Sequence, residues 1–380
     1  MKKLWIWIAV VAFALSACGS ENAETPTTSE PVVERIVDDG VTTVGICLPA
    51  RDDRWEKEGE ALVEALDVGN YAVQLLYAEE DAQVQADQVE KLIAADVDCL
   101  VVAAVDSLSL TEGLSHAKAE GIPVIAYDRL LMQTDSVTCY VAFDMLGAGK
   151  TMAEYIVDEK QLTTAHEESR SYTIELFMGT PEDNNALFLY QGIMDVLQTY
   201  IDSGVLICLS GRLPFEDCCI PGWSAELAKE ACDLRLKEHY PETVPDILCA
   251  ASDSLAEGVC ESMQIIGYAG EQLITGQGAQ TEAIERVQAG TQSMTLQPDT
   301  QELVRQCVMA VDALLQGRQP EYNDIDSCFN GEVTVPAYLL PMELVAPEKE
   351  IPPTEESVPT TETSPQATEE SKENTTPTRS

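Results

Sequence analysis

The stretch CLVVAAVDSLSLTEGLSHAKAEGIPVIAYDR, residues 99–129, holds two short apolar runs on either side of a segment of helical length. The runs Cys99–Ala104 and Pro123–Tyr127 have the length and composition of buried strands. The segment between them ends at Gly121, a residue that favours the left-handed C-cap of a helix. We therefore predict a strand–helix–strand unit whose two strands are parallel and buried.

The same alternation of strand and helix extends in both directions along the chain. Strand-like runs at Val44–Leu48 and Ala72–Tyr77 precede the unit, and helix-period stretches separate them. The pattern restarts beyond Phe143, with further runs at Tyr172–Met178, Val205–Leu209, Asp246–Ala250 and Gln272–Thr275. The sequence predicts an α/β fold of two doubly wound parallel-sheet lobes joined by a hinge, near Phe143–Asp144 and again near Thr295–Pro298.

The composition argues against several classes of function. The chain has 380 residues and a formal net charge of −44, and such a surface repels the phosphate backbone of nucleic acid. Its three histidines lie far apart, so no pair has the spacing of zinc ligands. We expect no nucleic acid partner, no metal and no cofactor.

The twelve cysteines leave two interpretations open. Five of them lie in apolar runs, where cysteine behaves as a small buried hydrophobic residue: Cys47, Cys99, Cys139, Cys208 and Cys249. In the first interpretation most of the cysteines are unpaired core thiols. In the second, one or two disulfides form, and the adjacent Cys218 and Cys219 are the candidates.

The N-terminus has the features of an export signal. Lys2 and Lys3 precede an uncharged apolar stretch, and the small residues of L-S-A-C lead to Cys18. This ending resembles the lipobox of bacterial lipoproteins, in which the cysteine becomes the mature N-terminus and carries lipid. We expect a lipoprotein signal peptide at residues 1–17 and lipidation of Cys18, with an ordinary signal peptide or an uncleaved anchor as the alternative.

Changes in composition also mark the limits of the two lobes. Residues 18–40 predict a disordered tether, and residues 347–380 predict a disordered acidic tail rich in Thr, Pro and Ser. Between them, we expect residues 41–143 plus 297–346 to form the N-terminal lobe. Residues 144–296 would form the C-terminal lobe.

Polar and aromatic residues gather where the predicted strands end. In open α/β sheets ligands bind beyond the carboxyl ends of the strands, and this rule selects the candidates by position. They are Arg54, Asp106, Asp128, Arg129, the group Asp183–Asn185, Asp253 and Gln277, with Trp55 and Trp223 nearby. Carboxylates, amides and guanidiniums suit the adjacent hydroxyls of a monosaccharide, and aromatic rings suit its apolar face.

Each candidate also has a simpler structural interpretation. Asp128 and Arg129 could form a surface ion pair, and Asp253 could cap the helix that follows it. The two tryptophans could pack in a core or between the lobes. Within Asp183–Asn185 we expect one residue to cap a helix and another, Asn185, to bind ligand.

The chain resembles the xylose-, glucose- and multiple-sugar-binding proteins of bacterial ABC transporters, which have the type I periplasmic binding protein fold. The likeness covers about residues 44–344. It rests on six motifs in order: Arg54-Trp55, Ala126–Leu130, Ala142–Asp144, Gly179–Ala186, Ser252–Ala256 and Gly276-Gln277. One departure is Gly278, where the family usually has an acid, and it leaves the role of Gln277 and the identity of the sugar open.

The resemblance implies a role for nine of these residues. Residues that hold the sugar would be Arg54, Asp128 and Arg129 from the first lobe, and Asn185, Asp253 and Gln277 from the second. Asp106 matches a polar position that lines the same cleft. Trp55 and Trp223 would sandwich the sugar ring. The resemblance also implies a third crossing between the lobes at Asp324–Asn330.

The expected function is that of a substrate-binding lipoprotein that binds an aldopentose or aldohexose, such as xylose or glucose, and delivers it to an ABC-transporter permease. The alternative is a sugar-sensing receptor that signals to a chemoreceptor or sensor kinase. We do not expect an enzyme, because arginines beside the carboxylates favour their ionised form, which suits a general acid poorly. The protein would be a monomer outside the cytoplasm, anchored to the cell membrane through Cys18, at the cell surface or the periplasmic face.

Overall fold

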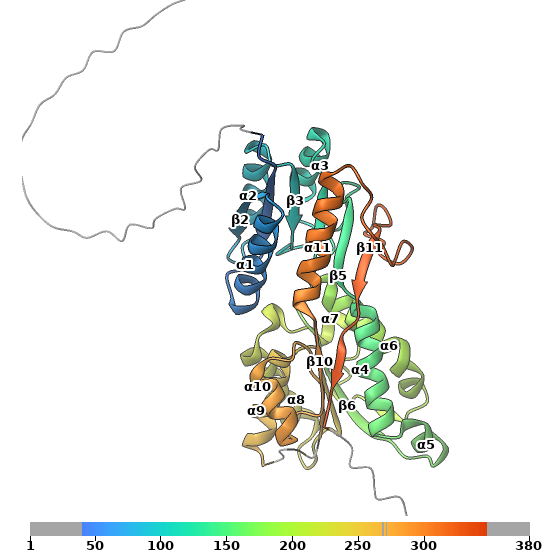
Figure 1. Ribbon diagram of the computed structural model, residues 1–380. Helices are drawn as coiled ribbons and strands as arrows, with labels where there is room; N and C mark the ends of the chain where they lie inside the picture. Colours follow the sequence, from blue (N-terminus) through green and yellow to red (C-terminus); the bar gives the residue numbers. More distant parts are fainter. Residues whose placement is uncertain (1–39, 268–269, 271, 348–380) are drawn as a thin grey trace, which may run out of the picture. The chain divides into compact units, whose positions relative to one another are not determined.

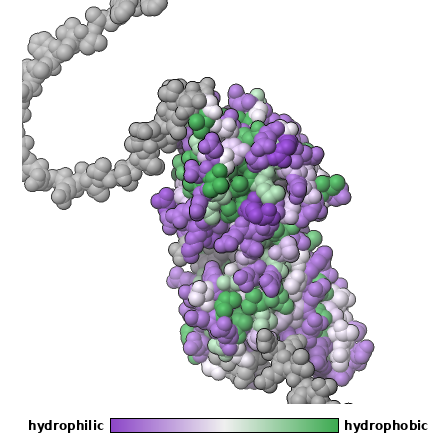
Figure 2. All heavy atoms as spheres, in the orientation of Figure 1, coloured by the Kyte–Doolittle hydropathy of each residue, from purple (hydrophilic) through white to green (hydrophobic). Residues whose placement is uncertain are grey.

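The computed structural model describes residues 40–267, 270 and 272–347. The predicted signal peptide, the lipidation site Cys18 and nearly all of the predicted tether and tail lie outside the described residues. Inside them, no helix combines the length and the apolar character that a membrane span requires. The face drawn in Figure 2 is mainly hydrophilic, with small apolar groups on both lobes.

Six parallel strands form the sheet of the first lobe, in the order β11-β5-β4-β3-β1-β2 (Figure 1). They are β1 (Thr43–Leu48), β2 (Ala72–Tyr77), β3 (Cys99–Val102), β4 (Val124–Tyr127), β5 (Cys139–Phe143) and β11 (Ala337–Leu340). Val44, Ile46 and Leu48 belong to one hydrophobic core and Cys47 to the other, because successive side chains of a strand point to opposite faces.

Helices cover both faces of this sheet. The core on one face includes residues of α1 (Asp53–Val68) and α11 (Thr300–Leu315). The core on the other face includes residues of α2 (Ala82–Ala94) and α3 (Thr111–Glu120). Burial on both faces explains why these strands are apolar almost throughout. Gly121 ends α3 at φ +77°, as the sequence predicted.

Four parallel strands form the sheet of the second lobe, in the order β7-β6-β8-β9. They are β6 (Tyr172–Phe177), β7 (Leu206–Ile207), β8 (Ile247–Ala250) and β9 (Leu273–Ile274). The helices of this lobe are α4 (Met145–Glu159), α5 (Leu162–Glu167), α6 (Asn184–Asp202), α7 (Phe215–Cys218), α8 (Ala225–His239), α9 (Asp253–Ile265) and α10 (Thr281–Ala289). The predicted class of two doubly wound parallel-sheet lobes is confirmed.

The described chain passes between the two sheets at three places. The first is Asp144, between β5 and α4, whose N–H donates to the Leu340 carbonyl at 2.7 Å. The second joins β10 (Thr295–Gln297) to α11. The third joins β11 to β12 (Glu343–Val345), which pairs with β10 in antiparallel register. The predicted hinge residues therefore lie where the chain changes sheets.

The third crossing was predicted in the wrong place. Asp324 forms a bridge with Ala337 of β11, and the Asn330 amide donates to the carbonyls of Leu131 and Thr134 at 3.0 and 2.7 Å. Residues 324–330 are therefore bound to the first lobe. The buried Asn330 side chain satisfies loop carbonyls that the sheet does not pair, and such a role leaves no local sequence signal.

The cysteines of the described residues are all unpaired, Cys218 and Cys219 included. Most of them are buried, in agreement with the first interpretation of the sequence. Burial raises the pKa of the Cys47, Cys139 and Cys249 thiols to about 12, so these groups stay protonated at neutral pH.

Helices α4 and α6 approach each other closely at two glycines. A β-carbon on Gly149 would overlap the Leu189 carbonyl oxygen, and one on Gly192 would overlap that of Leu146. The two backbones thus touch without intervening side chains. Because α4 begins at the first crossing and α6 begins at the candidate site, this contact fixes one to the other.

We predict that Gly192→Ala lowers the free energy of unfolding by about 1–3 kcal/mol, because the helices must separate to admit one methyl group. This loss outweighs the roughly 1 kcal/mol that alanine gains in helix propensity. Urea denaturation measures the change. Thr199→Ala, on the exposed face of α6, is the control and should stay within about 0.5 kcal/mol of the wild type. An unchanged Gly192→Ala protein would contradict the close contact.

Candidate functional site

The first turn of α1 presents Arg54 and Trp55 at the carboxyl end of the first sheet. Asp52 caps this helix, and its carboxylate accepts from the backbone N–H groups of Arg54 and Trp55 at 3.0 and 2.9 Å. The Trp55 ring is buried and belongs to the hydrophobic core. The Arg54 and Arg129 guanidiniums lie 4.4 and 5.6 Å from its centre. Trp55 is therefore a core residue that also makes cation–π contacts with both arginines.

Asp128 follows β4 in the left-handed region, with φ +61°, which is uncommon for a residue other than glycine. The Tyr140 hydroxyl donates to its carbonyl at 2.9 Å, and Arg54 Nη2 donates to its Oδ1 at 2.8 Å. Only 3% of the residue is exposed. The surface ion pair considered from the sequence is therefore ruled out, since Asp128 is buried and its acid is oriented by Arg54.

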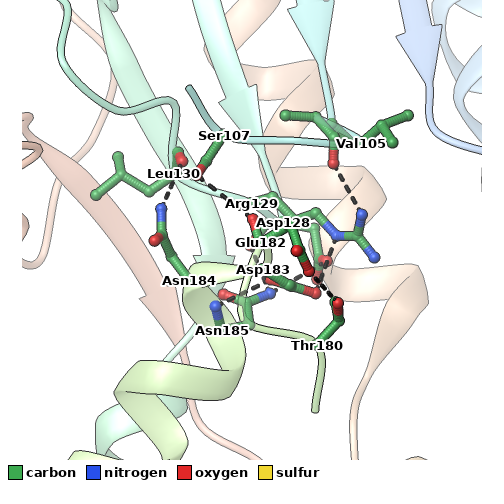
Figure 3. A network of polar contacts seen from close by, with 12 residues as sticks. Val105, Ser107, Asp128, Arg129, Leu130, Thr180, Glu182, Asp183, Asn184 and Asn185 are labelled. Carbon is green, nitrogen blue, oxygen red and sulfur yellow. Dashed lines mark hydrogen bonds and ion pairs between the residues drawn. The ribbon is translucent and has the colours of Figure 1, made fainter. Parts of the chain in front are cut away.

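Arg129 contacts groups of both lobes (Figure 3). Its Nη1 donates to the Ala104 carbonyl at 2.8 Å, and its Nε lies 3.2 Å from Asp183 Oδ2. Asp183 is also the N-cap of α6 and accepts from the Asn185 N–H at 3.0 Å. Asp183 is thus the capping residue of the Asp183–Asn185 group.

Asn185 connects the second lobe to Asp128. Its Nδ2 donates to the Asp128 carbonyl at 3.1 Å and lies 3.4 Å from the carboxylate (Figure 3). The side chain is nearly buried, yet its Oδ1 has no hydrogen-bond partner among the described residues. A buried amide oxygen without a donor is uncommon in native proteins. A hydroxyl group delivered to this position would satisfy it.

Trp223 lies in a short 3-10 turn, Pro221–Trp223, with φ +53°. Its ring packs against the backbone of Gly179, where a β-carbon would overlap it. The glycine that opens the Gly179–Ala186 motif therefore makes room for Trp223. No local pattern indicates this contact, because 44 residues separate the two positions.

Asp253 is fully buried in the second lobe and holds its loops together. Its carboxylate accepts from Gln292 Nε2 at 2.8 Å, from Thr295 Oγ1 at 3.0 Å and from the Gln280 N–H at 3.2 Å. The N-cap of α9 is Ser252, so the capping alternative for Asp253 was wrong. Burial raises the pKa of the Asp253 carboxyl group, against the opposing effect of these hydrogen bonds.

Gln277 and Gly278 border this buried acid. The Gln277 carbonyl accepts from the Asp253 N–H at 2.9 Å. Gly278 has φ +129°, and a β-carbon there would lie 3.4 Å from Asp253 Oδ2. An acid in this backbone conformation would be strained and would face another carboxylate. The departure from the family pattern therefore fits the local geometry of this chain.

The structure joins five of the nine predicted residues in one network: Arg54, Trp55, Asp128, Arg129 and Asn185. No hydrogen bond, ion pair or ring contact among the described residues links this network to Trp223, Asp253 or Gln277. Asp106 also stands apart, and its Oδ1 accepts from the Leu108 N–H at 2.8 Å in the turn before α3. Whether these four contact ligand stays a prediction.

Sequence reasoning missed two polar residues at the edge of the network: Glu58 accepts from Arg54, and Tyr140 donates to Asp128. Asn184, which belongs to the predicted Asp183–Asn185 group, was given no role of its own, and its Nδ2 donates to the Leu130 carbonyl at 3.2 Å. The spacing of four residues between Arg54 and Glu58 was available as a signal, because such pairs share one face of a helix. Tyr140 and Asn184 act on backbone carbonyls, which no pattern of side chains indicates.

Comparisons with known proteins agree with this architecture. A family model described as the periplasmic binding protein domain matches residues 44–319. The chain is 37% identical to the multiple sugar-binding periplasmic protein SbpA of Azospirillum brasilense, over 78% of this chain and 84% of that protein. It is 29% identical to the D-xylose-binding periplasmic protein of Escherichia coli, over 76% of this chain and 82% of that protein.

Solved structures give the same result. An ABC transporter solute-binding protein from Clostridium phytofermentans with bound β-D-glucose is 37% identical, with a TM-score of 0.76. The match covers 80% of this chain and 94% of that one. A carbohydrate transporter solute-binding protein from Chloroflexus aurantiacus in complex with D-glucose is 28% identical, with a TM-score of 0.70, over 80% and 93% of the two chains.

The buried Asp253 predicts a pH dependence of stability. A raised pKa means that the folded protein holds this proton more tightly than the unfolded chain does. The contribution of Asp253 to the free energy of unfolding is therefore full below about pH 4 and falls as the pH rises through the native pKa. Asp253→Asn should remove this fall, so the stability of the wild type relative to the variant should decrease as the pH rises above about 4.

Urea denaturation at a series of pH values measures this difference. Asp158→Asn, at an exposed position near the end of α4, is the control and should show no such trend. A wild type that gains stability over Asp253→Asn as the pH rises would contradict the prediction.

Proposed function

Because the chain belongs to the periplasmic binding protein domain family, we propose that it binds a monosaccharide between its two lobes and delivers it to an ABC-transporter permease. The observation that carries the proposal is the unpaired Oδ1 of Asn185, buried in a network that spans both lobes. A sugar hydroxyl is a donor that fits this acceptor. The periplasmic and transporter relatives support the same role.

The chemistry of the network supports a hydroxylated ring as the ligand. The Arg54 guanidinium offers donors, the Asp128 carboxylate offers acceptors, and the Asn185 amide offers both. The guanidiniums of Arg54 and Arg129, which lie over the buried Trp55 ring, offer donors that suit the polar edge of a pyranose. D-Glucose and D-xylose, which the named relatives bind, are the first ligands to test.

Closure of the lobes would couple binding to delivery. The contacts Arg129–Asp183, Asn184–Leu130 and Asn185–Asp128 each join the first lobe to the second. A sugar held by both lobes adds contacts that exist only in this arrangement, so it shifts the population toward the closed state. A permease that recognises the closed state would then receive only loaded protein. The role is binding without chemical change of the sugar.

The place of action would be outside the cytoplasm, as the family implies. We propose that lipid on Cys18 anchors the protein to the membrane and that residues 19–40 act as a tether. We propose that the protein acts as a monomer.

Isothermal titration with D-glucose and D-xylose tests the proposed function. Asn185→Ala and Asp128→Asn should each weaken binding by at least about tenfold, because each leaves buried partners unpaired on the protein or on the sugar. Thr199→Ala, an exposed change on the same helix as Asn185, should leave affinity unchanged. Equal affinity in all three variants would contradict the site, and a wild type that binds no aldose would contradict the function.

The lipid anchor has its own test in the bacterial cell. Cys18→Ser should abolish incorporation of labelled palmitate and move the protein from the membrane fraction to the soluble fraction. Cys260→Ser, a change of a thiol within the second lobe, is the control and should stay in the membrane fraction. Retention of label in Cys18→Ser would contradict the anchor.

A further inference from the structure

Glu58 is a buried carboxylate that lies one helical turn after Arg54 on α1. Only 4% of the residue is exposed, although a glutamate is seldom buried unless it is paired. Its Oε1 accepts from Arg54 Nε at 2.8 Å, and its Oε2 accepts from the Tyr127 hydroxyl at 2.7 Å. Both oxygens therefore have a donor, and the donors come from different elements of the first lobe.

These contacts close a ring. Tyr127 is the last residue of β4, and Asp128 follows it in the chain. Arg54 binds Glu58 through Nε and Asp128 through Nη2, while Glu58 binds Tyr127. Four residues thus form a cycle of three hydrogen bonds and one peptide link. The cycle fixes the first turn of α1 against the end of β4, where Asp128 adopts its left-handed conformation.

The cycle determines which part of Arg54 is free. Nε and Nη2 are occupied, and one face of the guanidinium lies over the Trp55 ring at 4.4 Å. Nη1 has no hydrogen-bond partner among the described residues, and 45% of the side chain is exposed. A planar guanidinium that is bound through two nitrogens and packed on one face keeps a single orientation. Nη1 is then the donor that remains for a ligand.

We infer that Glu58 is a positioning residue of the sugar site, which orients Arg54 and so presents its Nη1 to the ligand. The inference rests on the proposed function. A buried ion pair contributes little net stability, because the loss of hydration offsets the attraction of the charges. A role in orienting the site accounts for its presence. Residues that hold a binding group in place commonly change affinity by ten- to a hundredfold when they are replaced.

The test is Glu58→Gln, which keeps the shape of the side chain and removes its charge. Isothermal titration with D-glucose and D-xylose should show affinity at least about tenfold weaker than in the wild type. The matched control is Glu175→Gln in the second lobe. Glu175 is equally buried, accepts from the Tyr240 hydroxyl at 2.8 Å and lies 3.4 Å from Arg235, outside the network. That variant should bind sugar as the wild type does, even where it unfolds at a lower temperature.

A double-mutant cycle separates positioning from a general loss of structure. If Glu58 acts through Arg54, then Glu58→Gln should have almost no further effect in an Arg54→Lys background, because lysine lacks the Nε that Glu58 binds. Tyr127→Phe removes only the hydroxyl, and it should weaken binding by about threefold. This variant keeps the inference testable if Glu58→Gln does not fold.

A readout without sugar completes the experiment. In nitrogen-15 NMR spectra of the wild type, the Nε–H of Arg54 should exchange slowly with water, and the signal should be lost in Glu58→Gln. A fast-exchanging Nε–H in the wild type, additive effects in the cycle or equal sugar affinity in Glu58→Gln would each overturn the inference alone. A wild type that shows the slow signal and binds neither sugar would overturn the proposed function and the inference with it.

Discussion

The left-handed turn at Asp128 is the constraint on which the site depends. A residue with a β-carbon is disfavoured at φ +61°, so the surrounding groups must stabilise this conformation. Tyr140 binds the carbonyl of Asp128, and Arg54 binds its carboxylate. The turn directs the acid along the edge of the first lobe and leaves the same carbonyl open to Asn185. A single peptide conformation thus brings a strand end, a helix start and the opposite lobe together.

Much of this fold follows from the sequence, because its elements have strong local signals. The apolar runs from Cys99 to Tyr127 and the glycine at 121 sufficed to place β3, α3 and β4. Short strands were harder: the run predicted at Val205–Leu209 pairs over only two residues, Leu206–Ile207. Pairing needs a neighbour, and the length of a ladder depends on residues that are distant in the sequence.

The site was predicted less completely than the fold. The rule that ligands lie beyond strand ends found Arg54, Asp128 and Asn185, which the structure joins. The same rule also selected Asp253, whose carboxylate binds three groups of its own lobe. A position at a strand end does not tell whether a carboxylate faces a ligand or supports the loops around it. That distinction depends on Gln292 and Thr295, some forty residues further along the chain.

The glycine contact between α4 and α6 makes the two helices move as one rigid unit. Helix α4 begins at Asp144, where the chain leaves the first sheet, and α6 begins beside Asn185. Because the two backbones touch at Gly149 and Gly192, a rotation at Asp144 carries the Asn185 amide through the same angle, with little lost to sliding between helices. Two glycines that do not contact the ligand thus determine how far Asn185 moves when the chain rotates at Asp144.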